Sequence, residues 1–149
     1  MFKELPSAER ETFGVIRNLD KATRGGIRLG LYNYGGALRK EAQAEMLKKN
    51  KKGRIYNVRI RGRKVRHRAS APHQTAANMT GKLRKSIDFT VQGTEGIVFG
   101  AHTEYAAFLE EGTRKMSPRP TLKNSMKANY RNGRNYIESG IADKLLQNR

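Results

Sequence analysis

Hydrophobic and small residues recur at intervals of three or four through the first third of the chain, which is the spacing of one face of an α-helix. The stripe runs from Ile16 to Met46, and Ser7 stands where an N-cap residue is expected. An unbroken helix over residues 8–49 would extend about 60 Å, too long to be buried against a domain of this size. We therefore expect part of it to contact something else. Five glycines between positions 25 and 36 leave a kinked or two-piece helix equally open.

A different pattern follows this helix. Tyr56, Val58 and Ile60 alternate with polar residues, and Gly62 offers a turn, which together predict a β-hairpin. The window 48–68 holds eleven Lys and Arg residues and no acidic residue. Because the apolar face of this hairpin is too small to anchor it in a core, we predict a projecting basic arm over residues 48–68.

The next segment predicts a loop, a short helix and a second hairpin. Residues 69–79 have no apolar period, and Thr80 then stands where it could cap a short helix that ends at Ile87. Apolar residues alternate over 87–91, a Gly-Thr-Glu-Gly turn follows, and the chain returns over 97–99. This hairpin is the more apolar of the two, so we expect it to belong to the core.

Two more helices are expected near the C-terminus. Thr103 is placed to cap a short helix over residues 104–111, which Gly112 would close. Pro120 suits the first turn of a single final helix, whose apolar stripe continues over residues 122–145.

These elements together predict an α+β fold in a single domain, residues 1–149: a long N-terminal helix, a projecting basic β-hairpin, a small antiparallel sheet, a short helix and a C-terminal helix. Hydrophobic residues make up only 36% of the chain, so we expect a thin core. Thirty-one Lys and Arg against thirteen Asp and Glu give a net charge of +18, of which the arm supplies +11. A charge of this size implies a polyanionic partner, either nucleic acid or an acidic protein surface.

No arrangement of residues in the sequence predicts catalysis. The absence of cysteine excludes thiol nucleophiles and thiolate metal sites and fits a reducing compartment. We find no glycine-rich phosphate loop or nucleophile elbow, and the three histidines stand at spacings that match no metal signature. The one dense acidic group, Glu104, Glu110 and Glu111, is more typical of a solvated helix face than of a Mg²⁺ site. We therefore predict a non-enzymatic protein without cofactor or metal, and keep a metal-dependent nuclease as a minor alternative.

The basic arm has two interpretations. Runs of basic residues are commonly no more than solvated surface. Here the charges alternate with β-forming residues and Arg outnumbers Lys from Arg54 onward, which favours docking on phosphate or carboxylate groups. Because only Tyr56 could stack on a base, the contact would be made with a nucleic-acid backbone rather than with its bases. The predicted polyanion-binding residues are Lys51, Lys52, Arg54, Arg59, Arg61, Arg63, Lys64, Arg66 and Arg68.

Short motifs in the second half of the chain keep a definite order and spacing. A Thr-Gly-x-Leu-Arg-x-Ser-Ile run precedes the second hairpin, a Tyr-Ala-x-x-Leu-Glu-x-Gly-Thr run follows it, and Arg-Pro-x-Leu comes next. The residues singled out are Thr80, Gly81, Leu83, Tyr105, Ala106, Glu110, Gly112, Thr113, Arg119, Pro120 and Leu122. Over residues 69–126 this order resembles the neck or tail-completion proteins of tailed bacteriophages. The simplest interpretation of the motif residues themselves is that they hold the fold.

The resemblance implies a structural protein of the virion. Such a subunit would form a homo-oligomeric ring of six or twelve copies around the DNA passage, after assembly in the host cytoplasm, with no membrane contact. Its neighbours would be connector, terminator or tail-tube proteins, and double-stranded DNA would pass through the lumen. Ring subunits bury long helices and arms on their neighbours, which accounts for a thin core. The residues alone leave a second hypothesis open, a stand-alone nucleic-acid-binding module that uses the arm.

Overall fold

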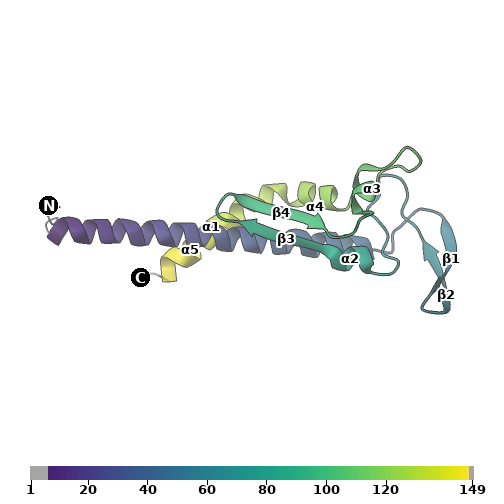
Figure 1. Cartoon of the computed structure of the whole chain (residues 1–149), viewed down its shortest axis with the longest axis horizontal. Coiled ribbons are helices and arrows are strands. Elements are labelled where there is room, and N and C mark those ends of the chain that lie inside the picture. The colour runs from purple at the N-terminus through teal and green to yellow at the C-terminus, as the bar shows by residue number, and fades with distance from the viewer. Residues whose placement is uncertain (1–6, 148–149) are drawn as a thin grey trace.

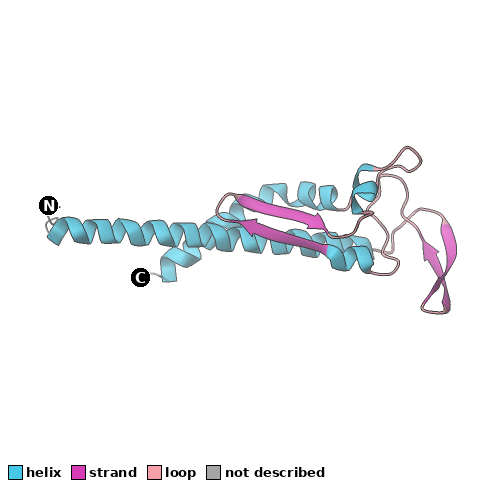
Figure 2. Cartoon of the chain, viewed as in Figure 1, coloured by secondary structure: helices cyan, strands magenta, loops and turns pink. Residues whose placement is uncertain are grey.

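A computed structural model of the chain describes the backbone of residues 7–147 and the side chains of residues 12–147; the expected cap at Ser7 lies outside the described side chains. The molecule is elongated and built around one long helix, and the fold is α+β, as the sequence predicts (Figures 1 and 2). The elements are α1 (Ser7–Leu47), β1 (Ile55–Ile60), β2 (Arg63–Arg68), α2 (Lys82–Ser86), β3 (Ile87–Gln92), β4 (Gly96–Ala101), α3 (Ala106–Glu111), α4 (Leu122–Asn129), a 3₁₀ turn (Tyr130–Asn132) and α5 (Gly133–Gln147).

Helix α1 is continuous over 41 residues, so the two-piece alternative is wrong. Gly26 and Gly30 serve close packing instead of a kink. A Cβ atom on Gly30 would lie 2.5 Å from Ile137 Cα, and one on Gly26 would overlap the backbone of Ile141. On the α5 side, a Cβ on Gly140 would lie 2.5 Å from the Gly26 carbonyl oxygen. The two helices therefore cross almost backbone to backbone, which only residues without a Cβ permit.

The core lies around the C-terminal half of α1. Ala42 and Met46 of α1 pack with Ala76 and Ile87, and partly buried residues surround this cluster: Leu83, Phe99, Ala101, Leu109 and Leu122. Strands β3 and β4 form an antiparallel hairpin with Phe89 opposite Phe99, and the hairpin runs along α1 (Figure 1). Of the eight hydrophobic residues buried in the described part of the chain, four are alanines. The core is thin, as expected from the composition.

The end of the chain differs from the single helix that the sequence predicts. A 3₁₀ turn separates α4 from α5, and Met126 and Tyr130 of the expected stripe are 49% and 81% exposed. The break follows Asn129, whose side-chain amide donates to the Ser125 carbonyl, and the next residues up to Gly133 include further poor helix formers. Pro120 precedes the helix, because Thr121 is the N-cap of α4.

Two expected caps are also wrong. Helix α3 begins at Ala106, not at residue 104, and the Thr103 hydroxyl is buried without a hydrogen-bond partner among the described residues. The Thr103 carbonyl accepts from the Ala106 N–H in its place. Before α2, the N-cap position belongs to Gly81 at φ 82°, and the Thr80 hydroxyl accepts only one long bond, 3.4 Å, from the Lys82 N–H. The helix ends at Ser86.

Within residues 7–147, no helix combines the length and the apolar run that a membrane crossing requires.

Candidate polyanion and partner interfaces

The basic hairpin lies beyond the C-terminal end of α1 (Figure 1). Its strands contact chiefly each other, and Arg61 and Gly62 form the turn with φ of 49° and 81°, the two positive values that a two-residue hairpin turn of this hand requires. At the other end, Gln74 ties the root of the hairpin together. Its side-chain oxygen accepts from the N–H groups of Lys52 and Ala71 at 3.1 Å, and its amide nitrogen donates to the Asn50 carbonyl.

The strand register divides the hairpin into two faces. Directly paired residues share a face. The pairs Tyr56–His67, Val58–Val65 and Ile60–Arg63 form the apolar face, and the pairs Ile55–Arg68, Asn57–Arg66 and Arg59–Lys64 form the opposite face. We call the second the cationic face and define it by its four charged residues, Arg59, Lys64, Arg66 and Arg68, all exposed.

The apolar face is turned toward the rest of the molecule. Tyr56, Val58 and His67 line an open pocket of about 330 Å³ together with Met79 and Leu109 of the body. Because side chains alternate between the two sides of a strand, the cationic face points away from this pocket. Tyr56, the one aromatic residue of the hairpin, is thus on the side opposite the four residues of the cationic face.

Eight of the nine predicted arm residues have exposed side chains, but they are not all in one place. The cationic face holds four, Arg61 is in the turn, and Arg63 is on the apolar face near the tip. Lys52 and Arg54 lie at the root, where the Arg54 carbonyl accepts from the Ala69 N–H.

Lys51 contradicts the prediction, because its side chain is buried. The residue is 8% exposed, and its ammonium group donates to the carbonyls of Glu45 at 3.0 Å and of Thr75 at 3.1 Å. The Glu45 carbonyl belongs to the last turn of α1, where carbonyls lack helical partners and a cation is favoured by the helix dipole. Lys51 therefore ends α1 and ties it to the loop that precedes α2, and it is not a polyanion ligand.

Replacing Lys51 is expected to change the pH dependence of stability. Burial lowers the pKa of the Lys51 ammonium from its ordinary value of 10.5. At pH values between the lowered pKa of the folded protein and 10.5, Lys51 holds its proton in the unfolded chain but not in the folded one. The free energy of unfolding therefore rises with pH in that window, and below it Lys51 does not change how the free energy of unfolding depends on pH. Lys51→Met should cost about 1–2 kcal/mol at pH 7 through two lost hydrogen bonds. Urea unfolding at pH 7 and above pH 10 should show a larger cost at high pH.

Lys52→Met is the control for this experiment, since the Lys52 side chain is exposed. It should change neither the stability nor its pH slope by a measurable amount. Equal pH slopes for Lys51→Met and the wild-type chain would contradict the buried position of the ammonium group.

Among the motif residues, Glu110 has an unexpected contact. Its carboxylate accepts from the backbone N–H groups of Thr121 at 2.6 Å, Leu122 at 2.8 Å and Lys123 at 3.3 Å. These are the unpaired donors at the start of α4, so a residue of α3 caps α4 from eleven positions away in sequence. The negative charge also suits the positive end of the helix dipole. The motif glutamate is therefore structural.

Most of the other motif residues also hold the fold. Gly112 ends α3 at φ 79°, and a Cβ there would lie 2.8 Å from the Met116 carbonyl oxygen. Thr113 forms a reciprocal backbone bridge with Met116, and the Arg119 N–H donates to the Leu109 carbonyl at 2.6 Å. Of the rest, Leu83 and Leu122 pack on the core cluster and Ala106 is buried, while Tyr105 is 39% exposed.

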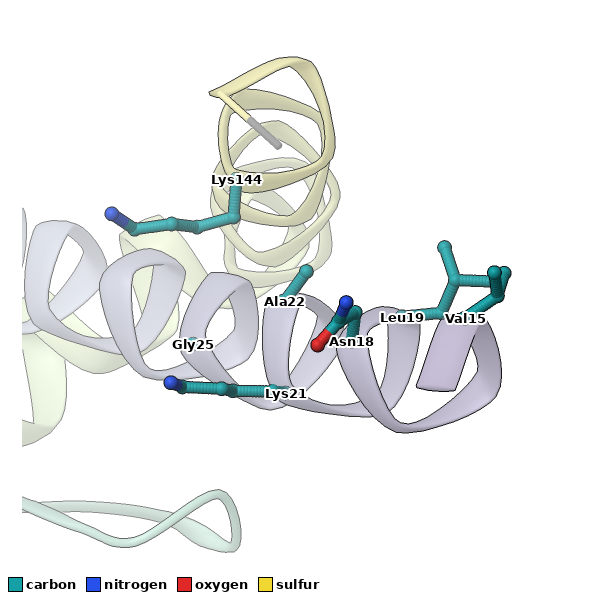
Figure 3. A pocket seen from close by; sticks show the side chains of 7 residues that line it. All are labelled: Val15, Asn18, Leu19, Lys21, Ala22, Gly25 and Lys144. Atoms are coloured by element: carbon teal, nitrogen blue, oxygen red, sulfur yellow. The ribbon is translucent and has the colours of Figure 1, made fainter. Parts of the chain in front are cut away.

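A second candidate surface is at the opposite end of the molecule. Helix α1 extends past α5 (Figure 1), and on this stretch the large hydrophobic side chains are more than half exposed: Phe13, Val15, Ile16 and Leu19. An open pocket of about 610 Å³ is lined by Lys144 of α5 and six residues of α1: Val15, Asn18, Leu19, Lys21, Ala22 and Gly25. Figure 3 shows Leu19 and Ala22 projecting toward the side on which α5 lies. The α1–α5 interface thus continues into a surface that nothing covers within residues 7–147.

Sequence patterns did not reveal three of these contacts. The Glu110 cap, the Gln74 ties and the buried Lys51 each join segments that the chain separates by more than ten residues. The acid-free hairpin and the overlong helix were visible, because both depend on local pattern. Within the described residues, no group of three or more His, Asp or Glu side chains is placed to hold a metal ion.

The chain matches no family model, no curated protein and no solved structure in the three comparisons.

Proposed function

We propose that this protein is a non-enzymatic structural subunit of a tailed bacteriophage, which forms a homo-oligomeric ring at the neck and joins the capsid connector to the tail around the DNA passage. The observation that carries the oligomer is the overhanging part of α1. A helix of this kind that lacks tertiary contacts is marginally stable alone, and Ile16 and Leu19 there are 56% and 53% exposed. We call the exposed side chains of this stretch, Phe13, Val15, Ile16 and Leu19, the apolar stripe of α1. A neighbouring subunit that packs on the apolar stripe would bury it.

The position of this stripe supports a self-association surface. It continues the face of α1 that contacts α5. A helix of a second copy could therefore pack on α1 beyond the end of α5, in the way that α5 packs on it within one subunit. The thin core is a further support, because subunits that complete their cores on neighbours need less apolar area of their own. The motif order over residues 69–126 supplies the bacteriophage setting.

The ring is tested by native mass spectrometry and light scattering of the full chain. We expect Ile16→Gln/Leu19→Gln to raise the apparent dissociation constant of the oligomer at least about 100-fold, since each buried side chain contributes about 1.5–3 kcal/mol. Because both side chains are exposed in the single subunit, the stability of the monomer should stay within about 0.5 kcal/mol of wild type.

The matched control changes two exposed basic residues of the same stretch that do not line the pocket beside Lys144, Arg17→Gln/Arg24→Gln. It should leave the assembly state unchanged. A wild-type chain that stays monomeric in solution and is absent from purified virions would overturn the proposal.

A second candidate function is a stand-alone nucleic-acid-binding module. The observation that favours it is the cationic face, which has no acidic neighbour in the surrounding sequence. Tight DNA binding by a monomer that forms no ring would favour this function over the ring.

A further inference from the structure

The charges of the cationic face are not balanced within the molecule. Residues 46–87 contain no Asp or Glu. None of the ion pairs that the structure describes includes a residue of β1 or β2; they are Asp20–Arg24, Glu45–Lys48, Arg39–Asp88, Glu111–Lys123 and Arg134–Glu138. Arg59 stands directly opposite Lys64, and like charges in that position destabilise a strand pair. An anion from outside the chain would remove this repulsion.

The composition of the face favours a phosphate backbone over an acidic protein. Protein interfaces are typically anchored by aromatic and apolar side chains at their centre. On this hairpin Tyr56, Val58 and Val65 are on the opposite face, and Ile55 is the one apolar residue on the cationic face. Contacts with phosphates require only donors, and Arg supplies two of them in a planar fork.

The geometry also fits a duplex. Side chains two apart on one strand are separated by roughly 6.8 Å, which is close to the rise of two nucleotides measured along the axis of B-DNA. Arg66 and Arg68 have this spacing on β2, and Lys64 continues it toward the tip. The major groove of B-DNA is wide enough to admit a two-stranded ribbon.

We propose that Arg59, Lys64, Arg66 and Arg68 form a binding site for the phosphate backbone of double-stranded DNA, independent of base sequence. The site occupies the face of the hairpin opposite Tyr56 and Val58, which line the pocket against the body. This inference rests on the proposed function for its biological setting, because it names the DNA of the passage as the ligand of the arm.

The test is fluorescence anisotropy of labelled 30-base-pair duplexes of two unrelated sequences, titrated with the full chain between 50 and 200 mM salt. The face variant is Arg59→Gln/Lys64→Gln/Arg66→Gln/Arg68→Gln. Four neutralised phosphates contribute about −3.6 to the slope of the logarithm of the association constant against the logarithm of the salt concentration. The variant should lose this part of the slope and bind about a thousandfold more weakly at 0.1 M salt. The two duplexes should bind equally to the wild-type chain.

A matched control removes the same number of Arg and Lys charges from exposed positions elsewhere, Arg28→Gln/Arg114→Gln/Lys127→Gln/Arg131→Gln. It should stay within about tenfold of wild type. Circular dichroism and urea unfolding verify that both variants fold. Equal losses in the two variants would overturn the site, and so would a wild-type chain that binds a polyglutamate peptide but not DNA. A strong preference between the two duplexes would overturn backbone recognition.

The same samples separate this inference from the ring. Native mass spectrometry reports assembly independently of DNA. Rings that bind no duplex would overturn the DNA site and leave the proposed function standing. Monomers that bind duplex through the cationic face would support the site and overturn the ring.

Discussion

Gly26→Ala/Gly30→Ala is expected to destabilise the protein by about 2–4 kcal/mol, although Ala is the better helix former. Each substitution places a Cβ against the backbone of α5, at Ile137 for Gly30 and at Ile141 for Gly26. Backbone atoms cannot rotate away as side chains do, so the helices must separate and lose contacts along the whole crossing. Overpacking typically costs 1–3 kcal/mol per site, and against backbone atoms we expect about 2–3 kcal/mol per site, which exceeds the gain of roughly 1 kcal/mol per site in helix propensity. Urea denaturation measures the difference.

The matched control uses two glycines of the same helix that face open space, Gly14→Ala/Gly36→Ala. It should stabilise the protein by about 1 kcal/mol, because Ala restricts the unfolded chain and nothing opposes its methyl group. If the control is destabilised to the same extent, the close packing of α1 on α5 does not explain the effect of replacing Gly26 and Gly30. A stabilised Gly26→Ala/Gly30→Ala variant would contradict the close α1–α5 crossing itself.

Glu110→Ala is expected to cost about 2–3 kcal/mol. The substitution leaves the backbone N–H groups of Thr121, Leu122 and Lys123 without their acceptor and removes a charge from the start of α4. Amide exchange at these three positions should accelerate more than exchange in α1. Glu110→Gln keeps a side-chain oxygen and should lose about half as much.

The neighbouring Glu111 provides the control. It pairs with Lys123 at 2.8 Å, but both side chains are largely exposed. Glu111→Ala should therefore change the free energy of unfolding by less than about 0.5 kcal/mol. Equal effects at the two glutamates would mean that the cap contributes nothing beyond surface charge.

The two proposed surfaces lie at opposite ends of the long axis. The apolar stripe of α1 is at the N-terminal end and the cationic face is beyond the C-terminal end of the same helix (Figure 1). A subunit of this shape can pack on a neighbour at one end and reach DNA at the other without competition between the two contacts. Variants of one surface should therefore leave the other contact intact, which the experiments above measure.

Local pattern predicted the elements well where neighbouring residues decide the conformation. The register and turn of the basic hairpin follow from alternation around Gly62, and α1 follows from its apolar stripe. Prediction was wrong at Lys51 because a distant segment competes: the side chain was expected to be exposed, but its ammonium reaches the carbonyls of Glu45 and Thr75. It was also wrong at Thr103, whose hydroxyl was expected to cap α3 and has no hydrogen-bond partner among the described residues.

The sequence by itself determined the α+β order, the overlong helix and the concentration of charge in residues 48–68, because periodicity and composition act over a few neighbouring residues. Only the tertiary structure decided which cations share a face, why α1 carries Gly26 and Gly30, and which donors Glu110 satisfies. Each of these depends on two segments meeting at atomic distance. The amino-acid sequence gives the residue types of both segments but not the distance between them in space.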